Sequence, residues 1–174
     1  MRNLVLGVLT AFTFLLAGGA TSLQADGGDM SLGGGLAYAT DINSLGIAAR
    51  GYYELPSEEY VFYIVPELIY YLPSTSNAGP DIQWITFDVM GHWLFENSEE
   101  FYLYALAGIG VRYFSSTVEN PFGGEFSDSQ TDINLDIGAG VEYETDFGGI
   151  FGEFRFVFTD GTFLVFDTGV RFPI

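Results

Sequence analysis

Hydrophobic and polar residues alternate strictly from Thr131 to Tyr143, in the stretch TDINLDIGAGVEY. One set of alternate positions is apolar and ends in Tyr143, whereas the other set holds only charged, amide and glycine residues. A period of two predicts a β-strand, because successive side chains leave a pleated backbone on opposite sides. The run exceeds an ordinary soluble strand of about 5–6 residues. It matches the roughly 10-residue alternating segment of a transmembrane β-barrel.

The same alternation recurs along the chain and predicts eight strands. Loops after the second, fourth and sixth strands are short, and those after the third and fifth are longer, as in outer-membrane barrels with both termini in the periplasm. Lipid tolerates no open strand edge, so the sheet is expected to close. The sequence therefore predicts an all-β, eight-stranded antiparallel up-and-down transmembrane β-barrel. The predicted strands are 30–40, 45–55, 60–72, 82–95, 101–114, 131–143, 150–158 and 163–172.

Several places are expected to interrupt this pattern. Pro66 cannot donate to a strand ladder, so a bulge or a local distortion is expected in the third strand. A two-residue Asp160-Gly161 turn would set Thr159 opposite Thr162, although the alternation puts them on opposite faces, so a bulge or a strand out of phase by one residue is expected. Turns are predicted at 96–99 and 145–149, and the longest loop is predicted at 115–130.

The first residues have the pattern of a secretory signal peptide. Arg2 gives a positive start, residues 4–16 are uncharged and largely apolar, and small residues at 17–20 supply a cleavage site. The alternative, a membrane-anchor helix, is disfavoured because the apolar stretch is shorter than the roughly 20 residues needed to span a bilayer. We expect a signal peptide at 1–20, with Ala25 as a later cleavage site, and a barrel domain at 26–174.

Composition supports a membrane barrel and limits its partners. Aromatic residues make up 17% of the chain, an excess that an outward apolar band with aromatic girdles requires and a soluble domain does not. The formal net charge is −18, and no lysine occurs. This balance disfavours nucleic acid and other anionic partners, because binding them requires a basic patch. The chain has no cysteine, so the fold is expected to form without disulfides.

All four arginines of the expected barrel fall on the face opposite the apolar band, together with many of the acids. The interior of an eight-stranded barrel is just wide enough to be filled by side chains, and charges buried there need partners. We therefore predict a lumen filled by an Arg–carboxylate network. Its members are Arg50, Glu67, Asp88, Arg112, Asp136, Glu142, Glu153, Arg155, Asp167 and Arg171. The residues expected to pack around it are Tyr52, Trp84 and Tyr104. The glycines expected to make room for these bulky neighbours are Gly108, Gly110, Gly138 and Gly140.

Candidate catalytic and metal-binding residues are few. His92 is the only histidine, it faces inward, and no nucleophile is positioned beside it in the pattern, so we expect a hydrogen-bonded lumen histidine and no enzyme activity. One histidine without cysteine forms no metal-site spacing. Glu125, Asp128 and Asp132 could gather Ca²⁺ at the 115–130 loop, but they lack a regular ligand loop, and solvated acids are favoured. We expect no metal and no cofactor.

Four strand segments carry a family likeness: LYALAGIGV (103–111), LDIGAGVEY (135–143), FGEFRFVF (151–158) and FDTGVRF (166–172). They resemble the outer-membrane-protein β-barrel domain family, which contains the small porin-like, opacity-type barrels of Gram-negative bacteria. The resemblance implies that the barrel-assembly machinery recognises the final strand by alternating apolar residues that end in an aromatic. The fitting residues are Leu164, Phe166, Thr168, Val170 and Phe172, and Pro173 and Ile174 follow them as a departure.

The expected function is that of an integral outer-membrane barrel with a filled lumen, in a structural or surface-interaction role through its outer loops. Its expected partners are outer-membrane lipid, the secretion and barrel-assembly machinery, and an extracellular partner at the 115–130 loop, whose acids are Glu119, Glu125 and Asp128; we expect a monomer. One alternative is a narrow porin-like channel for small solutes or cations, which needs a continuous water path past the lumen arginines. Another is a soluble calycin-like barrel for an apolar ligand, which would turn Arg112 and Arg155 outward.

Overall fold

The computed structural model is a closed barrel of eight antiparallel strands in sequence order. It describes residues 29–57, 60–72, 81–97, 100–119 and 125–174, so the predicted signal peptide lies outside the described residues. The strands are β1 Met30–Ala39, β2 Ser44–Leu55, β3 Phe62–Tyr71, β4 Asp81–Asn97, β5 Phe101–Glu119, β6 Glu125–Thr145, β7 Gly148–Phe158 and β8 Thr162–Pro173. The predicted fold class is confirmed.

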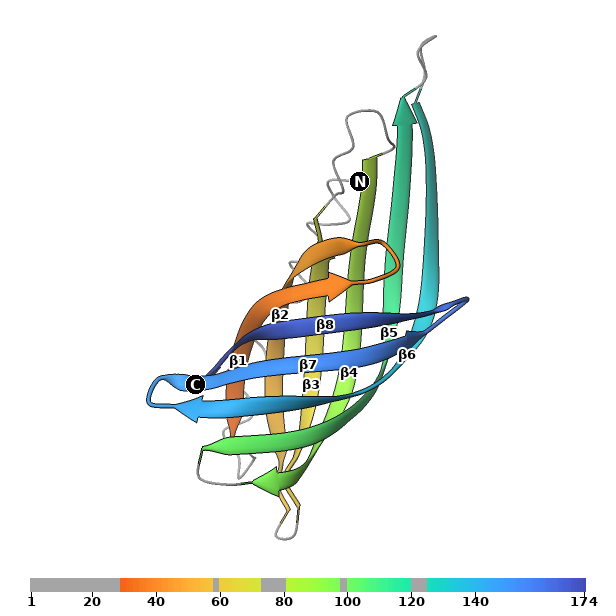
Figure 1. Cartoon of the computed structure of the whole chain (residues 1–174). Coiled ribbons are helices and arrows are strands. Elements are labelled where there is room, and N and C mark those ends of the chain that lie inside the picture. The colour runs from red at the N-terminus through yellow and green to blue at the C-terminus, as the bar shows by residue number, and fades with distance from the viewer. Residues whose placement is uncertain (1–28, 58–59, 73–80, 98–99, 120–124) are drawn as a thin grey trace.

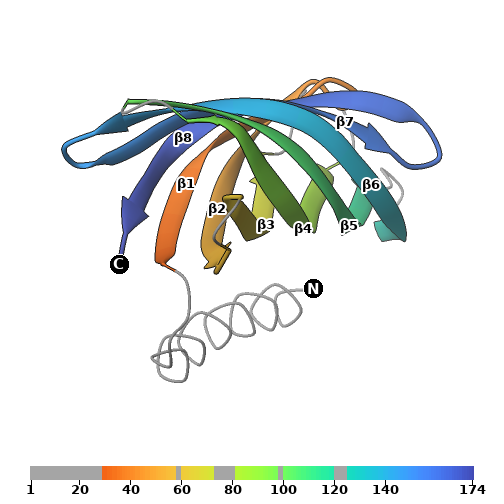
Figure 2. The same cartoon turned by 90° about the horizontal axis from the view of Figure 1, so that it is seen from below.

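Pairing of the first strand with the last closes the barrel. β8 runs antiparallel to β1 from Ser31↔Pro173 to Ala39↔Val165, and the two strands lie side by side in Figure 2. β1 therefore begins and β8 ends at one rim, which we call the terminus end. The connections β2–β3, β4–β5 and β6–β7 lie at this rim, and the opposite rim is the far end.

The β5–β6 hairpin corrects the predicted loop at 115–130. β5 continues to Glu119, β6 begins at Glu125, and the two strands stay paired as far as those residues. The loop prediction, which rested on two glycines, a proline and several acids, is wrong for 115–119 and 125–130, and 120–124 lie outside the described residues. A hairpin standing clear of the barrel wall needs no apolar face, so it lacks the alternation of the other strands. β6 pairs with β7 only from Leu135 onward, so its residues 125–134 rise beyond β7 (Figure 1), and no strand of the described part of the chain pairs with their second backbone edge.

Smaller corrections concern turns and bulges. β4 includes Glu96 and Asn97 and β7 starts at Gly148, so the predicted turns at 96–99 and 145–149 are too long. A bulge at Phe95, which the sequence analysis missed, shifts the β4–β5 register between Leu94 and Glu96.

The β2–β3 ladder explains how Pro66 is accommodated. Pairing breaks between Arg50↔Glu67 and Tyr53↔Ile64 and then resumes in the same register, so the expected irregularity is a gap and no bulge.

The conflict between the predicted faces at 159–162 also has a simple solution. Phe158 pairs with Thr162, so the turn has three residues, 159–161, and both strands keep their predicted faces.

Apolar side chains cover the outside of the barrel. Those with at least a third of their surface exposed include Leu36, Ile47, Phe87, Ile109, Ile137, Phe154, Phe156 and Phe166. Large aromatic residues gather on the outside near the terminus end: Tyr60, Trp93, Phe95, Phe101, Tyr143, Phe147 and Phe172. Arg112 and Arg155 point inward and are 9% and 1% exposed, so the calycin-like alternative is wrong. No helix among the described residues is long and apolar enough to cross a membrane.

Candidate functional site

Two arginines form the middle of the lumen. Arg50 on β2 and Arg155 on β7 are each 1% exposed, and Glu67 on β3, which is 0% exposed, contacts both of them. One oxygen of Glu67 accepts a hydrogen bond from Arg50 Nε, and the other lies 2.6 Å from Arg155 Nη1. A carboxylate shared by two guanidinium groups lets charges from three strands share one buried layer.

Three further acids complete the contacts of this layer. Glu153 Oε1 lies 2.7 Å from Arg50 Nη1 and also accepts a hydrogen bond of 2.7 Å from the Tyr104 hydroxyl. Asp167 Oδ2 lies 3.5 Å from Arg50 and 3.6 Å from Arg155, so it bridges both guanidinium groups. Asp88 Oδ2, on β4, lies 3.8 Å from Arg155 Nη2. Because Glu153 and Asp167 come from β7 and β8, their ion pairs tie the last strands to β2 across the lumen.

A glycine makes room for the acids of β4 and β6. Asn134 donates hydrogen bonds of 2.9 Å to Asp88 and 3.0 Å to Asp136, so an amide separates two buried carboxyl groups. This arrangement spans β5 at Gly110, where an added Cβ would lie 1.7 Å from Asp88 Oδ1. Gly110 is therefore the position that lets Asp88 reach Asn134, and any side chain there would displace the carboxyl group.

Arg112 holds together several elements near the far end. Its guanidinium lies 3.7 Å from Asp41 in the β1–β2 turn and 3.5 Å from Asp132 on β6. The group also stacks over the Trp84 ring, with 4.6 Å between the guanidinium carbon and the ring centroid. Partial burial raises the pKa of the Asp41 carboxyl, against the opposing effects of the Ile42 amide and Arg112.

Arg171 occupies the corresponding place near the terminus end. Its Nε lies 2.9 Å from Glu142 Oε1, and its Nη2 lies 3.6 Å from Glu144. The guanidinium carbon also lies 5.5 Å from the Tyr52 ring centroid and 5.2 Å from that of Tyr63. The four arginines thus form three tiers along the barrel, with the two-arginine layer in the middle.

Cavities lie on both sides of the middle layer. One of about 220 Å³ opens at the terminus end, and one of about 10 Å³ lies on the other side of the layer. No residue lines both. A cavity of about 10 Å³ is only marginally large enough for one water molecule, so the space beyond the middle layer is filled by side chains.

Known proteins match this chain in structure only. No family model matches the sequence, and no curated protein matches it. Ail, the attachment invasion locus protein of Yersinia pestis, is 17% identical over 83% of this chain and 97% of its own, with a TM-score of 0.55. The N-terminal barrel domain of Pseudomonas aeruginosa OprF is 12% identical over 86% of this chain and 100% of its own, with a TM-score of 0.59.

A third structure agrees with these two. A major outer membrane protein from Thermus thermophilus is 10% identical over 84% of this chain and 99% of its own, with a TM-score of 0.62. The chain has the fold of the small eight-stranded outer-membrane barrels. At identities below a fifth, the likeness is one of backbone fold and carries no role of the lumen or the hairpin from those proteins to this chain.

The ten residues of the predicted network all face the lumen of this outer-membrane barrel fold, in the three tiers described above. The three predicted outer-loop acids lie on the β5–β6 hairpin, where Asp128 is exposed and the side chains of Glu119 and Glu125 lie outside the described part. The structure therefore separates the buried charges of the lumen from the exposed Asp128 on the hairpin.

Sequence reasoning missed residues that link the tiers. Asn134 and Asp132 lie on the polar face of the 131–143 strand. The sequence suggested no lumen contact for either, and it gave Asp132 only a candidate role in holding Ca²⁺, because the pattern gives a face and no distance. His92, 2% exposed, stacks on Tyr104 at 4.8 Å, while its Nδ1 lies 3.9 Å from Glu153, too far for the expected hydrogen bond. In the described residues no group of three or more His, Cys, Asp or Glu side chains is arranged to hold a metal ion.

Proposed function

We propose that the protein is an integral outer-membrane barrel with a filled lumen, whose role is structural or surface-interacting through the far-end hairpin. The observation that carries this proposal is the combination of an exposed apolar exterior with a layer of buried ion pairs across the interior. Apolar residues outside and charges inside suit a barrel that is surrounded by lipid. The proposed domain division is a signal peptide at 1–20 followed by the barrel.

A filled lumen is favoured over a narrow channel. A channel needs continuous water, whereas Arg50, Glu67 and Arg155 are at most 1% exposed and are in contact with each other. Acids outnumber arginines in this layer, which would favour cations if a path existed. The small volume of the cavity behind the layer leaves no room for such a path. The ion pairs therefore act as a plug that holds the strands together.

The β5–β6 hairpin at the far end, which we call the far-end hairpin, is the surface that we assign to an extracellular partner. Residues 125–134 offer one strand edge that pairs with no other described strand, and an extended segment of another protein could add to it. Ail has been crystallised with sucrose octasulfate, a heparin analogue. A chain with a net charge of −18 would repel such an anion, so the partner we propose for this hairpin is a basic, extended protein segment.

Single cysteines introduced into this cysteine-free chain test its location and orientation. With Ser129→Cys, on the exposed hairpin, a membrane-impermeant maleimide should label intact Gram-negative cells. With Asp146→Cys, in the exposed β6–β7 turn, labelling should require permeabilised cells, because that end faces the periplasm. Both variants should fractionate with the outer membrane and migrate differently in detergent gels with and without boiling.

Two results would reject this part of the proposal. Recovery of unlabelled protein in the soluble fraction, with no effect of boiling, would exclude a membrane barrel. Labelling of Asp146→Cys on intact cells, with Ser129→Cys protected, would reverse the proposed orientation.

Shortening the hairpin tests its role. Ser116 pairs with Asp128, so deletion of 117–127 and closure by an Asn-Gly turn preserves the ladder below. The full chain in lipid nanodiscs should bind poly-lysine, and the shortened chain should bind it roughly tenfold more weakly at low salt because two acids are lost. Neither should bind sucrose octasulfate.

The matched control is the double variant Glu100→Gln with Asp146→Asn. It removes two exposed acids at the terminus end and should leave poly-lysine binding unchanged. Equal weakening of binding by this control would contradict a hairpin site.

A further inference from the structure

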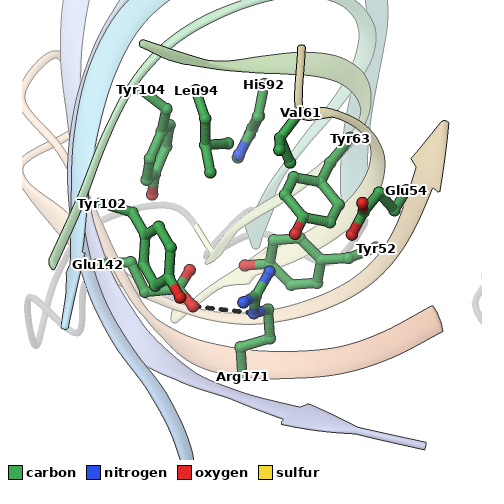
Figure 3. A pocket seen from close by; sticks show the side chains of 10 residues that line it. All are labelled: Tyr52, Glu54, Val61, Tyr63, His92, Leu94, Tyr102, Tyr104, Glu142 and Arg171. Atoms are coloured by element: carbon green, nitrogen blue, oxygen red, sulfur yellow. Dashed lines mark ion pairs between the residues drawn. The ribbon is translucent and has the colours of Figure 1, made fainter. Parts of the chain in front are cut away.

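The cavity of about 220 Å³ at the terminus end has a definite chemical character. We call it the vestibule. Tyr52, His92 and Tyr104 form its floor, and Tyr102, Glu142 and Arg171 stand around it (Figure 3). At about 30 Å³ for each water molecule, this space holds several waters or one small organic molecule.

Glycines on neighbouring strands create the space. An added Cβ on Gly140 would lie 2.4 Å from the Tyr104 ring, and one on Gly149 would lie 2.0 Å from Glu142 Oε1. Both side chains therefore lie flat across these glycines along the barrel wall and leave the centre of the lumen open. The vestibule is thus built by specific residue choices, in contrast to the filled space beyond the middle layer.

His92 offers an unused acceptor to this space. Its Nδ1 lies on the side of Glu153, 3.9 Å from Oε1, and the negative charge of this carboxylate favours the ring proton on Nδ1, which leaves Nε2 as an acceptor. His92 is 2% exposed, and its Nε2 has no hydrogen-bond partner among the described residues. Figure 3 shows the ring directed into the vestibule. A buried acceptor without a partner indicates a donor that the protein itself does not supply.

Charge and aromatic rings define the donor further. Glu54 and Glu142 line the vestibule, Glu144 lies 3.6 Å from Arg171, and Arg171 is the one arginine in the lining. Acids therefore outnumber the cation, and an anion would be repelled. The guanidinium of Arg171 already lies over two tyrosine rings of the vestibule. The faces of these rings therefore accept a positively charged group.

We propose that the vestibule binds a small organic ammonium ion, of the size of an amino alcohol or a short diamine. Its N–H groups would donate to His92 Nε2 and to the carboxylates of Glu54 and Glu142, while its methylene groups pack against the tyrosines. The middle layer behind His92 keeps the ion from passing through the barrel. This site goes beyond the proposed membrane role and does not depend on which side the vestibule faces.

Titration of the refolded mature chain in detergent micelles tests the proposal. Putrescine, at constant ionic strength, should cause saturable shifts in the NMR signals of His92, Tyr102 and Arg171. Glu54→Gln should weaken its binding about fivefold, since one carboxylate partner is lost. Asp132→Asn is the matched control, because this acid pairs with Arg112 near the far end, and it should leave binding unchanged. Leu94→Trp, which places an indole in the vestibule, should abolish binding.

Three outcomes would overturn the ammonium site. The first is the absence of saturable shifts with putrescine. The second is equal shifts with sodium chloride, which would mean a simple counter-ion effect. The third is equal binding of glycerol, which would mean that charge has no part. Because the measurement is made in micelles, it stands apart from the cell labelling that tests location, so failure of either idea is recognisable by itself.

Discussion

Replacing Glu67 with alanine is expected to lower the free energy of unfolding by about 3–5 kcal/mol, the cost of removing one partner from a buried ion pair. Glu67 is 0% exposed and contacts both Arg50 and Arg155, so its loss leaves two buried guanidinium groups short of a partner. The remaining acids of the layer already have their own contacts and cannot move into its place without breaking them. Urea unfolding of the refolded barrel in lipid vesicles, followed by tryptophan fluorescence, measures the loss.

Two comparison variants make the result specific. Glu67→Gln keeps the volume and one acceptor, so it should cost less than Glu67→Ala. Asp128→Ala removes an exposed acid of the hairpin and should change stability by no more than about 0.5 kcal/mol. A loss below about 1 kcal/mol for Glu67→Ala would mean that the arginines are hydrated, as in a water-filled channel, and would contradict the plug.

Alternation predicted the faces of the strands well because both faces carry a strong physical requirement. The outer face is apolar without interruption from Ile133 to Tyr143, and the inner face of the same strand bears the acids that meet arginines. The same requirement explains where prediction failed. Above the barrel wall neither face needs to be apolar, so 115–130 lost its alternation and was interpreted as a loop although the backbone ladder continues to Glu119↔Glu125.

The partners within the lumen could not be predicted to the same depth. Sequence gives Asp88, Asn134 and Asp136 a common inward face, but their meeting depends on the register of β4, β5 and β6 and on the absence of a side chain at Gly110. Register across a barrel is set by pairings between strands, which no single strand encodes. The vestibule was missed for the same reason, because it results from the positions of Gly140 and Gly149 on strands adjacent to Tyr104 and Glu142.

An arginine on the outer face is expected to reveal whether lipid surrounds the barrel. Ile137 on β6 is 49% exposed and pairs with Ala107 and Phe156, in the middle of the apolar band. Ile137→Arg should cost about 2–4 kcal/mol of stability in lipid vesicles, the cost of a charge near the bilayer midplane. Ile133, four positions earlier on the same face, is 77% exposed and lies beyond the last β6–β7 pair. Ile133→Arg should therefore cost only about 0–1 kcal/mol.

The pair of variants compares two depths on one strand. Both place the same arginine on the same face, so side-chain size is matched, and the sites differ in depth and in the β7 neighbour that Ile137 has and Ile133 lacks. If water covered the outer face, both substitutions would fall within about 0.5 kcal/mol of the unchanged chain. Equal costs would therefore reject the membrane-spanning band even if the barrel stayed closed. A large difference, measured again by urea unfolding from vesicles, would place Ile137 within the hydrocarbon layer and the hairpin outside it.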